Sequence, residues 1–458
     1  MNDLLNRLER LPMSRPQTRL LFMGGLGYTF DAMDGAVIAF VLAAIIKPWH
    51  LTNGETGLLG SALLIGYLIG AFLSGTLGDL IGRRTIIVWS LGFYSIATLI
   101  SAFADSWQFF FVFRVLAGIG TGAQSAIIAP YLSEFINSKV RGRYVGALAG
   151  FFSFGFVFAA LLGYFVIPTS PIGWRLVIII TALPVFLLIW WRRGLPESPR
   201  WLLSRNRTHE ASLVVEQLET HVAQATGKPL PPLENIVFSD GSANVGGTFQ
   251  TNLAALWRGR VARTTSMMWV LWFAITFAYY GFFTWIPTLL IKSGLTITKS
   301  FGYSIIIYLA QIPGYYSAAW LNERLGRKQT IVLYMALGAI SALLMAVYHT
   351  NLSIIIFGFC LSFFMNGSYA GIYAYTPEVY PTSYRTTGMG VASAVGRVGG
   401  ILAPLIIGFT YARIGFGGVF TVSTVVLAIG VIFVAWLGIN TRSKTLERIT
   451  AEELQLKA

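Results

Sequence analysis

Four ionisable side chains lie within stretches of sequence that are otherwise almost entirely apolar. Asp31 and Asp34 share one stretch, whereas Arg114 and Arg397 each lie in a stretch of their own. Burying such a group in hydrocarbon costs about 2.5–3.5 kcal/mol on insertion scales, so a charge at this depth is a candidate for binding or moving another charged species. Their types and positions therefore point to chemistry with protons and anions.

The two aspartates and Arg114 are predicted to meet near the middle of a membrane. Asp31 and Asp34 are three residues apart, so a helix presents both on one face. With helix geometry, Asp31 lies about 18 Å from the start of its stretch, and Arg114 lies about 12 Å in from the opposite side of a core of about 30 Å. Two carboxylates facing one guanidinium in a desolvated site do not both ionise readily, so one of them is expected to bind a proton. Either aspartate can be that one, and the competing interpretation is a static ion pair that joins two helices.

Arg397 has no acidic residue within its own stretch and lies about 18 Å beyond Arg385, again near the midplane. A guanidinium fork fits a carboxylate bidentately, so Arg397 is a candidate for binding an anionic substrate. The alternative is that Arg397 pairs with Asp31 or Asp34.

Aromatic side chains and two amides lie at similar depth in the second half of the chain. π faces beside a guanidinium suit a flat aromatic carboxylate, and amides can hydrogen-bond a ring heteroatom. Packing or interfacial anchoring is the alternative for the aromatics, and interhelical hydrogen bonding is the alternative for the amides. The candidates for substrate binding are Tyr280, Trp285, Gln311, Asn366, Tyr369 and Tyr373.

The amino-acid composition indicates the class of protein in which these groups lie. Of 458 residues, 55% are hydrophobic and 11% are charged, whereas soluble proteins are about 25% charged. This deficit excludes an ordinary cytosolic enzyme. The one cysteine, Cys360, excludes a disulfide framework and a cysteine-based cluster, and the four histidines form no paired metal motif. We therefore expect a membrane protein that is not an enzyme and that uses no cofactor or metal, with protons as coupling ion.

Twelve stretches are long and apolar enough to cross a bilayer as helices, and their continuous apolar character excludes barrel strands. The first 18 residues are polar and basic and show no cleavable signal peptide. The predicted spans are residues 19–47, 57–79, 85–104, 107–133, 143–166, 174–193, 264–292, 299–322, 330–349, 352–379, 386–412 and 417–439.

Basic residues give the predicted orientation, because cytoplasmic loops are enriched in Lys and Arg. With both termini cytoplasmic, 26 of the 33 Lys and Arg residues fall on the cytoplasmic side. The net charge of +14 then reflects topology and attraction to anionic lipid, and no nucleic-acid partner is needed to explain it. We expect a multi-pass protein of the inner (plasma) membrane.

The two halves of the chain repeat at a fixed offset. The segments GTLGDLIGRR and LNERLGRK, and the segments around Glu134 and Glu378, are each 244 residues apart. Two unrelated motif pairs with one offset indicate a duplicated six-helix unit, the architecture of alternating-access transporters. We therefore predict an all-α fold of two pseudo-symmetric six-helix bundles. The predicted parts are residues 1–193 (first bundle), 194–262 (cytoplasmic linker with short helices), 263–440 (second bundle) and 441–458 (cytoplasmic tail).

The repeated motifs place an acid and paired cations on a tight glycine turn at the cytoplasmic surface. There they can form ion pairs with the other half of the chain and cap a neighbouring helix, so they are predicted to latch one face closed. A positive-inside loop is the alternative, but it explains neither the acid nor the glycine. The predicted gating residues are Asp79, Arg83, Arg84, Glu134, Arg141, Glu323, Arg327, Glu378 and Arg385.

Several motifs resemble the major facilitator superfamily: GTLGDLIGRR, RVLAGIGTG from Arg114, and PESPRW at 196–201. The segment FDAMDGAVIAFVLAAI at 30–45 is similar to bacterial niacin transporters and their metabolite:proton symporter relatives. FAYYGFFTWIP at 277–287 and GRVGGILAPL at 396–405 resemble organic-ion carriers, the latter most like the organic-anion members. Asn440 departs from the glutamate that these relatives often carry in the tail.

The resemblance implies roles for individual residues. It makes Asp31 or Asp34 together with Arg114 the proton-coupling elements, associates Arg397 with anionic substrates, and places Tyr280 and Tyr369 in the ligand cavity. The sequence thus predicts a monomeric, proton-coupled transporter for uptake of a small organic anion, and the substrate it favours is an aromatic monocarboxylate such as nicotinate. The alternatives are another organic acid, a sugar or an organic cation as substrate, efflux in place of uptake, and, from a different class, a non-transporting membrane sensor.

Overall fold

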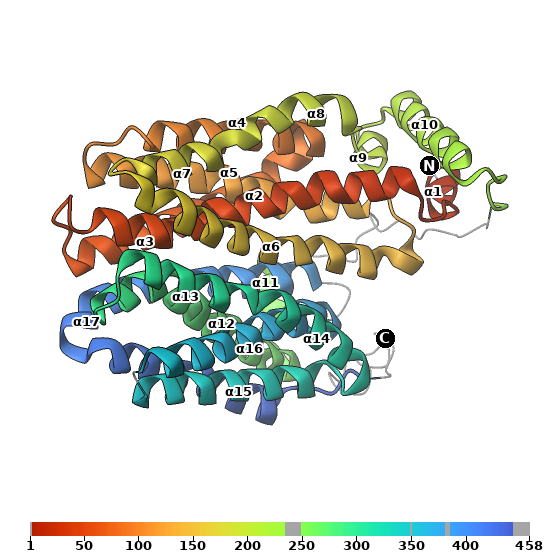
Figure 1. The fold of residues 1–458 in the computed structure, drawn as a ribbon. Coiled ribbons are helices and arrows are strands. Elements are labelled where there is room, and N and C mark those ends of the chain that lie inside the picture. The colour runs from red at the N-terminus through yellow and green to blue at the C-terminus, as the bar shows by residue number, and fades with distance from the viewer. Residues whose placement is uncertain (1, 234–248, 349, 381–384, 443–458) are drawn as a thin grey trace. The chain divides into compact units, whose positions relative to one another are not determined.

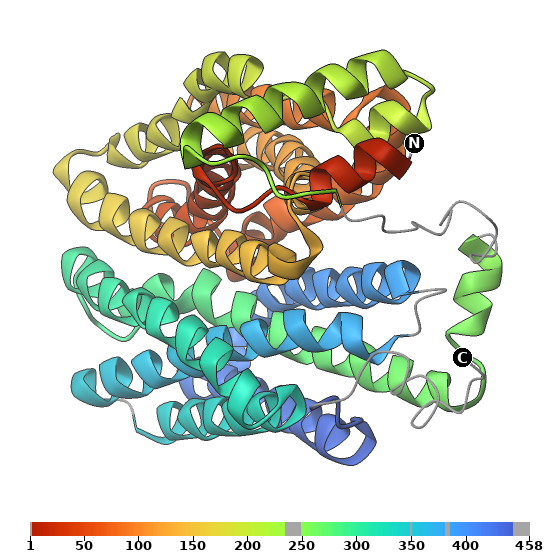
Figure 2. The same cartoon turned by 90° about the vertical axis from the view of Figure 1, so that its right-hand side faces the viewer.

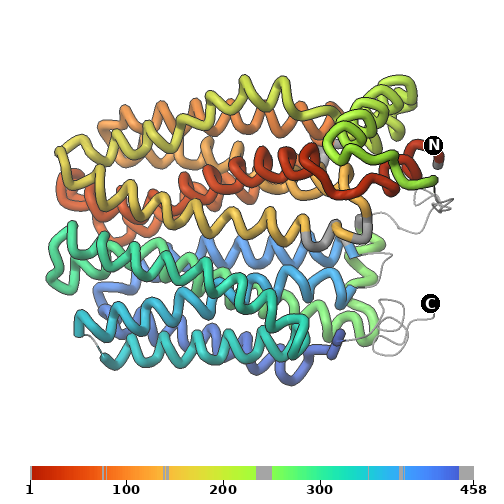
Figure 3. The backbone as a smooth tube through the Cα atoms, turned by 45° about the vertical axis from the view of Figure 1, so that its right-hand side comes forward, coloured from red at the N-terminus to blue at the C-terminus, as the bar shows by residue number. Residues whose placement is uncertain are grey.

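The computed structural model describes residues 2–233, 249–348, 350–380 and 385–442; the remaining residues are grey in Figures 1 and 3. Side chains at 75, 76, 79, 138, 139, 141–143 and 386 are also outside this description. The described residues form helices and connecting turns with no strand, which confirms the all-α prediction.

The helices of the first half follow the first six predicted spans closely. The sixth crossing is interrupted by a 3₁₀ turn, η2 (Leu183–Phe186), because Pro184 cannot donate a hydrogen bond to the preceding turn. The membrane helices are α2 (Arg15–Ile45), α3 (Asn53–Ile81), α4 (Arg83–Ser101), α5 (Trp107–Ser133), α6 (Ser138–Val166, followed by η1, Ile167–Thr169), α7 (Gly173–Ala182) and α8 (Leu187–Gly194).

The second half departs from the predicted spans at two places. The eighth crossing is broken at Ala310, since Pro313 has no N–H to offer the carbonyl of Leu309. The last two crossings form one long helix, bent at Gly415, whose φ of 62° suits glycine. The helices are α11 (Phe249–Ala255), α12 (Gly259–Lys292), α13 (Ile297–Leu309), α14 (Gln311–Arg324), α15 (Arg327–Val347), α16 (Asn351–Val379) and α17 (Arg385–Leu437).

These two departures explain a difference in helix number. Ten helical segments of the described residues are long and apolar enough to cross a membrane. The pair α13–α14 contributes none of them because each piece is too short, and α17 is a single segment that covers two predicted spans. With α13–α14 as one crossing and α17 as two, the twelve-span prediction is confirmed.

The chain divides by its internal contacts into two compact units. The predicted division of the chain, which follows the duplication, stays a prediction. The first unit comprises Met1–Val37, Ala62–Ala159 and Ile172–Gly241, and the second comprises Ile38–Ser61, Ala160–Pro171 and Ser242–Ala458.

The second unit therefore contains the ends of α2, α3 and α6 as well as α12–α17. Within it, the Ser61 hydroxyl donates to the carbonyl of Ile401 at 2.7 Å. The Phe40 ring meets the Phe301 ring edge-on with centroids 5.1 Å apart. These contacts tie the ends of α2 and α3 to α17 and α13.

In the first unit, α3 and α5 approach until their backbones touch. A Cβ atom on Gly118 would lie 2.1 Å from the carbonyl oxygen of Leu63, and one on Gly66 would lie 1.9 Å from that of Val115. Small residues permit this approach, which is a common way to join helices where no hydrophobic driving force exists in lipid.

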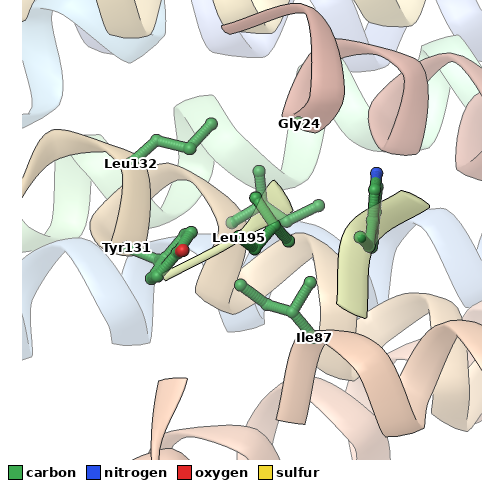
Figure 4. Close-up of a pocket in the computed structure, with 7 residues that line it drawn as sticks. Gly24, Ile87, Tyr131, Leu132 and Leu195 are labelled. Carbon is green, nitrogen blue, oxygen red and sulfur yellow. The ribbon is translucent and has the colours of Figure 1, made fainter. Parts of the chain in front are cut away.

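A small apolar cavity lies among α2, α4, α5 and α8 of the same unit (Figure 4). Its volume of about 10 Å³ is close to the minimum for one water molecule, and its apolar lining provides no polar surface to bind one. We regard it as a packing gap rather than a ligand site. Its lining residues are Gly24, Ile87, Ile128, Tyr131, Leu132, Trp191 and Leu195.

Three short helices cap one end of the first unit: α1 (Asn2–Glu9), α9 (Pro199–Ser204) and α10 (Thr208–Thr226). Figure 2 shows α1 lying along α10. Leu4 and Leu8 of α1 are buried in the same apolar cluster as Val215 of α10. On one side of this contact, Arg7 and Arg10 each approach the Glu219 carboxylate to 2.6 Å.

We predict that Gly118→Ala destabilises the protein, because the added methyl group must displace a neighbouring backbone. Overpacking of this kind costs about 1–3 kcal/mol. Gly146→Ala is the control, since its Cβ would meet nothing within 4 Å and alanine favours a helix by about 0.5–1 kcal/mol. The melting temperature measured in detergent should fall for Gly118→Ala and should stay the same or rise for Gly146→Ala. Equal melting temperatures would contradict the close approach of α3 and α5.

We also predict that protonation of Glu219 releases α1 from α10. Burial alone would raise the pKa of Glu219, but hydrogen bonds from Arg7 and Arg10 outweigh it and hold the pKa below its usual value. A lowered pKa stabilises the docked state above the unfolded value of about 4.3 and loses that stabilisation as pH falls through the folded value.

Glu219→Gln should mimic the protonated state at neutral pH. Trypsin should then cleave after Arg7 or Arg10 faster than in the wild type. Glu216→Gln is the matched control, because Glu216 lies on the exposed face of the same helix. Hydrogen exchange of α1, corrected for intrinsic rates, should rise on acidification in the wild type. Unchanged cleavage in Glu219→Gln would mean that the apolar contact alone holds α1.

Candidate functional site

A buried ion pair joins α2 to α5 in the first unit. Arg114 donates from Nη1 to Oδ1 of Asp34 at 2.9 Å and from Nη2 to the backbone carbonyl of Asp34 at 2.8 Å. The two side chains are 1% and 0% exposed. At this burial, loss of either partner would leave an uncompensated charge.

Two threonines reinforce the same carboxylate. Thr181 of α7 donates to Asp34 Oδ1 at 3.2 Å and Thr98 of α4 does so at 3.4 Å. Asp34 Oδ2 is buried and has no hydrogen-bond partner among the described residues. The Asp34 carboxylate is thus where α2, α4, α5 and α7 meet.

Asp31 lies one turn earlier on α2 and has different partners. Gln124 of α5 donates from Nε2 to Asp31 Oδ1 at 3.0 Å, and the Ser125 hydroxyl donates to Oδ2 at 2.8 Å. Within the part of the chain that the structure describes, Asp31 forms no ion pair. The three predicted proton-coupling residues thus share one polar layer, but Arg114 pairs with Asp34 and not with Asp31.

Sequence reasoning did not identify the four neutral partners in this layer. The available signal was their position, since each is a polar side chain inside a predicted span. That signal is weak, because most such side chains hydrogen-bond their own helix. The four are Thr98, Gln124, Ser125 and Thr181.

In the second unit, α17 carries Arg397 next to an aromatic cluster. Its Nη1 lies 3.4 Å from the Tyr280 hydroxyl of α12 and donates to it. Tyr280 meets Tyr279 edge-on with centroids 5.4 Å apart, and Tyr279 meets Tyr369 of α16 at 5.1 Å. Tyr373 continues the cluster, with its ring 6.1 Å from that of Tyr369.

A buried amide pair borders the same cluster. Gln311 Oε1 accepts hydrogen bonds from the Tyr279 hydroxyl at 3.1 Å and from Asn366 Nδ2 at 2.7 Å. Gln311 Nε2 is buried and has no partner among the described residues. A buried donor without a partner costs about 1–3 kcal/mol, so this amide can be satisfied by an acceptor on a ligand or by water.

Trp285 belongs to a different part of the second unit. Its indole N–H donates to the carbonyl of Pro404 at 3.3 Å, and its ring stacks on Tyr411 at an interplanar angle of 13°. The ammonium group of Lys292 lies 5.7 Å from the Trp285 ring centroid. The structure thus gives Trp285 no contact with Arg397 or Tyr280 among these interactions.

Among the described residues, the predicted gating residues include an ion pair within each half of the chain. Arg83 lies 3.6 Å from Glu134, and Arg327 lies 3.0 Å from Glu378. Each residue of the second pair is 244 positions after its counterpart. The duplication therefore repeats an interaction as well as a sequence motif. Whether these pairs latch a conformation stays a prediction.

The other gating candidates differ in their surroundings. The Arg84 backbone N–H donates to Glu197 at 3.1 Å, Arg385 donates to the carbonyl of Tyr380 at 3.2 Å, and Glu323 is exposed. The side chains of Asp79 and Arg141 lie outside the described residues.

A cleft of about 300 Å³ opens beside the first of these pairs. Burial raises the pKa of Glu134, although a hydrogen bond from Ser198 and the charge of Arg83 favour its ionised form. The lining residues are Arg83, Glu134, Arg200, Trp201, Ser204 and Arg205. Among the described residues, no group of three His, Cys, Asp or Glu side chains could hold a metal ion.

Comparison with known proteins places this arrangement in a family. The profile described as "Sugar (and other) transporter" matches residues 25–452, nearly the whole chain. The chain belongs to this transporter family of the major facilitator superfamily. Its members are transporters rather than enzymes, and the protein is a multi-pass membrane protein.

Relatives within the family carry related names. The "Niacin transporter NiaP" of Acinetobacter baylyi is 41% identical over 98% of this chain and 99% of its own length. A Bacillus subtilis protein, named as a candidate niacin/nicotinamide transporter, is 35% identical over 94% of this chain and 98% of its own length. "Organic cation/carnitine transporter 7" of Arabidopsis thaliana is 28% identical over 85% of both chains.

A solved structure supports the fold. The xylose transporter XylE from E. coli, in its inward open conformation, superposes with a TM-score of 0.74. The match covers 95% of this chain and 99% of XylE at 18% identity. At this sequence identity, the structural similarity shows a shared fold and does not indicate a shared substrate.

Proposed function

We propose that this transporter takes up an aromatic monocarboxylate, nicotinate above all, together with protons, by alternating access. It would act as a monomer in the inner membrane with both termini in the cytoplasm. The observation that carries this proposal is the guanidinium of Arg397 beside the aromatic cluster of Tyr280, Tyr279 and Tyr369. The name of the Acinetobacter baylyi relative supports the same substrate.

The proposed binding mode assigns one ligand group to each part of the cluster. Arg397 binds the carboxylate in a charge-assisted pair, with Tyr280 holding the guanidinium in place. The tyrosine rings pack against the faces and edges of the pyridine ring. The buried Gln311 Nε2 donates to the ring nitrogen, which would give this amide the acceptor that the described residues do not supply.

Proton coupling would use the polar layer of the first unit, where Asp31 and Asp34 lie on α2 near Arg114. The repeated Arg–Glu pairs at 83–134 and 327–378 would open and close as the conformation alternates. Both roles rest on the buried charges and on the sequence resemblance to proton-coupled relatives.

A second candidate substrate is an organic cation, since tyrosine faces attract cations and the Arabidopsis thaliana relative is named for one. Arg397 disfavours this candidate, because an ammonium group beside the guanidinium would be repelled. Nicotinamide is a third candidate, raised by the name of the Bacillus subtilis relative. It retains the ring nitrogen but offers no charge to Arg397.

Ligand stabilisation of the purified protein separates these candidates. We expect nicotinate to raise the melting temperature, with nicotinamide and the organic cation choline giving little or no shift at equal concentration. Benzoate, which has the carboxylate and lacks the ring nitrogen, should bind at least about 5-fold more weakly than nicotinate, because Gln311 Nε2 stays unsatisfied at a cost of about 1–3 kcal/mol. Stabilisation by choline alone would replace the anion by a cation, and a sensor would bind nicotinate without moving it into proteoliposomes.

Substitution of Arg397 tests the sign of the substrate directly. Arg397→Ala should weaken nicotinate binding by about 10²- to 10³-fold, as expected for about 3–5 kcal/mol lost with a desolvated charge partner. Arg397→Lys should restore only part of this affinity. Lysine keeps the positive charge, but an ammonium cannot reproduce the bidentate geometry of the guanidinium. Arg413→Ala, on the exposed side of the same helix, is the control. Near-normal nicotinate affinity in Arg397→Ala would remove the basis for the organic-anion proposal.

A further inference from the structure

Exposed arginines gather where α12 begins in the second unit. Arg258 is the N-cap residue of this helix, and Arg260 and Arg263 lie in its first two turns. None of them forms an ion pair with another described residue. The helices α11, α12 and α17 of the same unit contain no Asp or Glu. This end of α12 therefore carries positive charge that its neighbouring helices do not balance.

One of these arginines joins α12 to α17. Arg263 donates from Nη2 to the backbone carbonyl of Trp436 at 3.0 Å. Trp436 lies in the last turn of α17, where carbonyls have no partner within their own helix. A guanidinium has five N–H donors, so this bond leaves others of Arg263 for a ligand. Arg260 is three residues earlier and shares the same helix face, so the two guanidinium groups can bind one anion together.

The backbone of α12 adds donors at the same place. The side chain of Arg258 forms no capping hydrogen bond, so the first N–H groups of the helix lack the acceptor that Ser, Thr, Asp or Asn would supply. These N–H groups and the positive end of the helix dipole favour a phosphate. The arginine side chains and the start of the helix therefore favour an anion at one end of α12.

Two exposed tryptophans flank the arginines. Trp257 is 46% exposed and Trp436 is 73% exposed. The Trp257 ring meets the Trp269 ring of α12 edge-on at 4.9 Å, and the carbonyl of Leu256 accepts from the Thr265 hydroxyl at 2.9 Å. The segment before α12 is thus held along the helix with an indole on the surface. Exposed indoles of this kind are typical of the level of lipid headgroups.

The position of this basic corner, which comprises Trp257, Arg258, Arg260, Arg263 and Trp436, selects the kind of anion. Both α12 and α17 are long and apolar enough to cross a membrane, so their ends lie where hydrocarbon gives way to headgroups. A phosphate ion would bind the arginines but would leave the indoles exposed, whereas a phospholipid brings a phosphate and apolar chains together. A zwitterionic headgroup adds a cation that the arginines repel. An anionic phospholipid therefore fits the corner best.

We infer that the basic corner is a binding site for an anionic phospholipid such as phosphatidylglycerol. Arg260 and Arg263 bind the phosphate through charge-assisted hydrogen bonds, and the first turn of α12 adds its N–H groups. Trp257 and Trp436 lie against the glycerol and the upper part of the acyl chains. The site is independent of the nicotinate proposal, because no residue of the candidate substrate site belongs to it.

Native mass spectrometry of the purified protein in detergent tests the site with defined lipids. Detergent removes the bilayer, so general attraction to a charged membrane surface does not contribute. Each arginine near an anionic headgroup contributes about fivefold in affinity. The first phosphatidylglycerol molecule should therefore bind about 100-fold more tightly than phosphatidylcholine. Inorganic phosphate should not displace it at equal concentration; displacement would mean a site for soluble anions and would overturn the lipid assignment.

A matched pair of double variants separates the site from net charge. Arg260→Gln/Arg263→Gln should reduce the preference for phosphatidylglycerol by about 25-fold. Arg192→Gln/Arg193→Gln is the control, since it removes two exposed arginines from the last turn of α8. It should leave the preference within about twofold of wild type, because these arginines lie outside the basic corner. Arg258→Gln, whose side chain loses no hydrogen bond to another described residue, should reduce the preference by about fivefold.

The outcomes decide the assignment even where a variant is unstable. Equal losses in the two double variants would show that net charge alone attracts the lipid, and the inferred site would be wrong. A wild type that binds phosphatidylglycerol and phosphatidylcholine alike would have the same consequence. If a low melting temperature shows that Arg260→Gln/Arg263→Gln does not fold, Arg258→Gln decides, and an unchanged lipid preference in that variant would overturn the site.

Discussion

The cost of placing charge in hydrocarbon is the constraint on which the rest of this protein depends. Asp34 and Arg114 pay that cost together, at 0% and 1% exposure, through hydrogen bonds that bring four helices of the first unit to one point. The backbone contact of α3 with α5 at Gly118 fixes the helix that carries Arg114. Close packing and charge pairing thus support the same layer, and neither would hold its geometry without the other.

The second unit solves the same problem differently. Arg397 is half-buried, and it donates a hydrogen bond to the hydroxyl of Tyr280 at the edge of a cluster of tyrosine rings. Tyrosine offers a hydroxyl acceptor and a polarisable face, so it lowers the cost of a guanidinium while leaving the cation able to bind an anion. A charge that is fully paired serves structure, whereas a partly solvated one beside aromatic rings is suited to a ligand that comes and goes.

Much of the architecture could be predicted from the sequence, because long apolar stretches and a duplicated motif are strong signals. The repeat of the motifs followed from one offset, but the pairing of Arg83 with Glu134 and of Arg327 with Glu378 came only from the structure. The break in the helix at Ala310 was harder to predict from the sequence. Pro313 lies inside a stretch long enough for one span, and a proline can either bend or interrupt a helix. The partner of Arg114 was also open, because two aspartates three residues apart share a face and only packing decides which one a guanidinium reaches.

The contrast between repeated and unrepeated positions extends this argument. Arg83 and Glu134 recur as Arg327 and Glu378, whereas the positions 244 residues after Asp31 and Asp34 are Ile275 and Ala278. Duplication supplies both halves with the same Arg–Glu pair, and these half-buried pairs differ in geometry, with distances of 3.6 and 3.0 Å. A fully buried charge allows less latitude in geometry, so a second copy of the polar layer would have cost stability. One half could therefore keep the ionisable layer while the corresponding positions of the other became apolar.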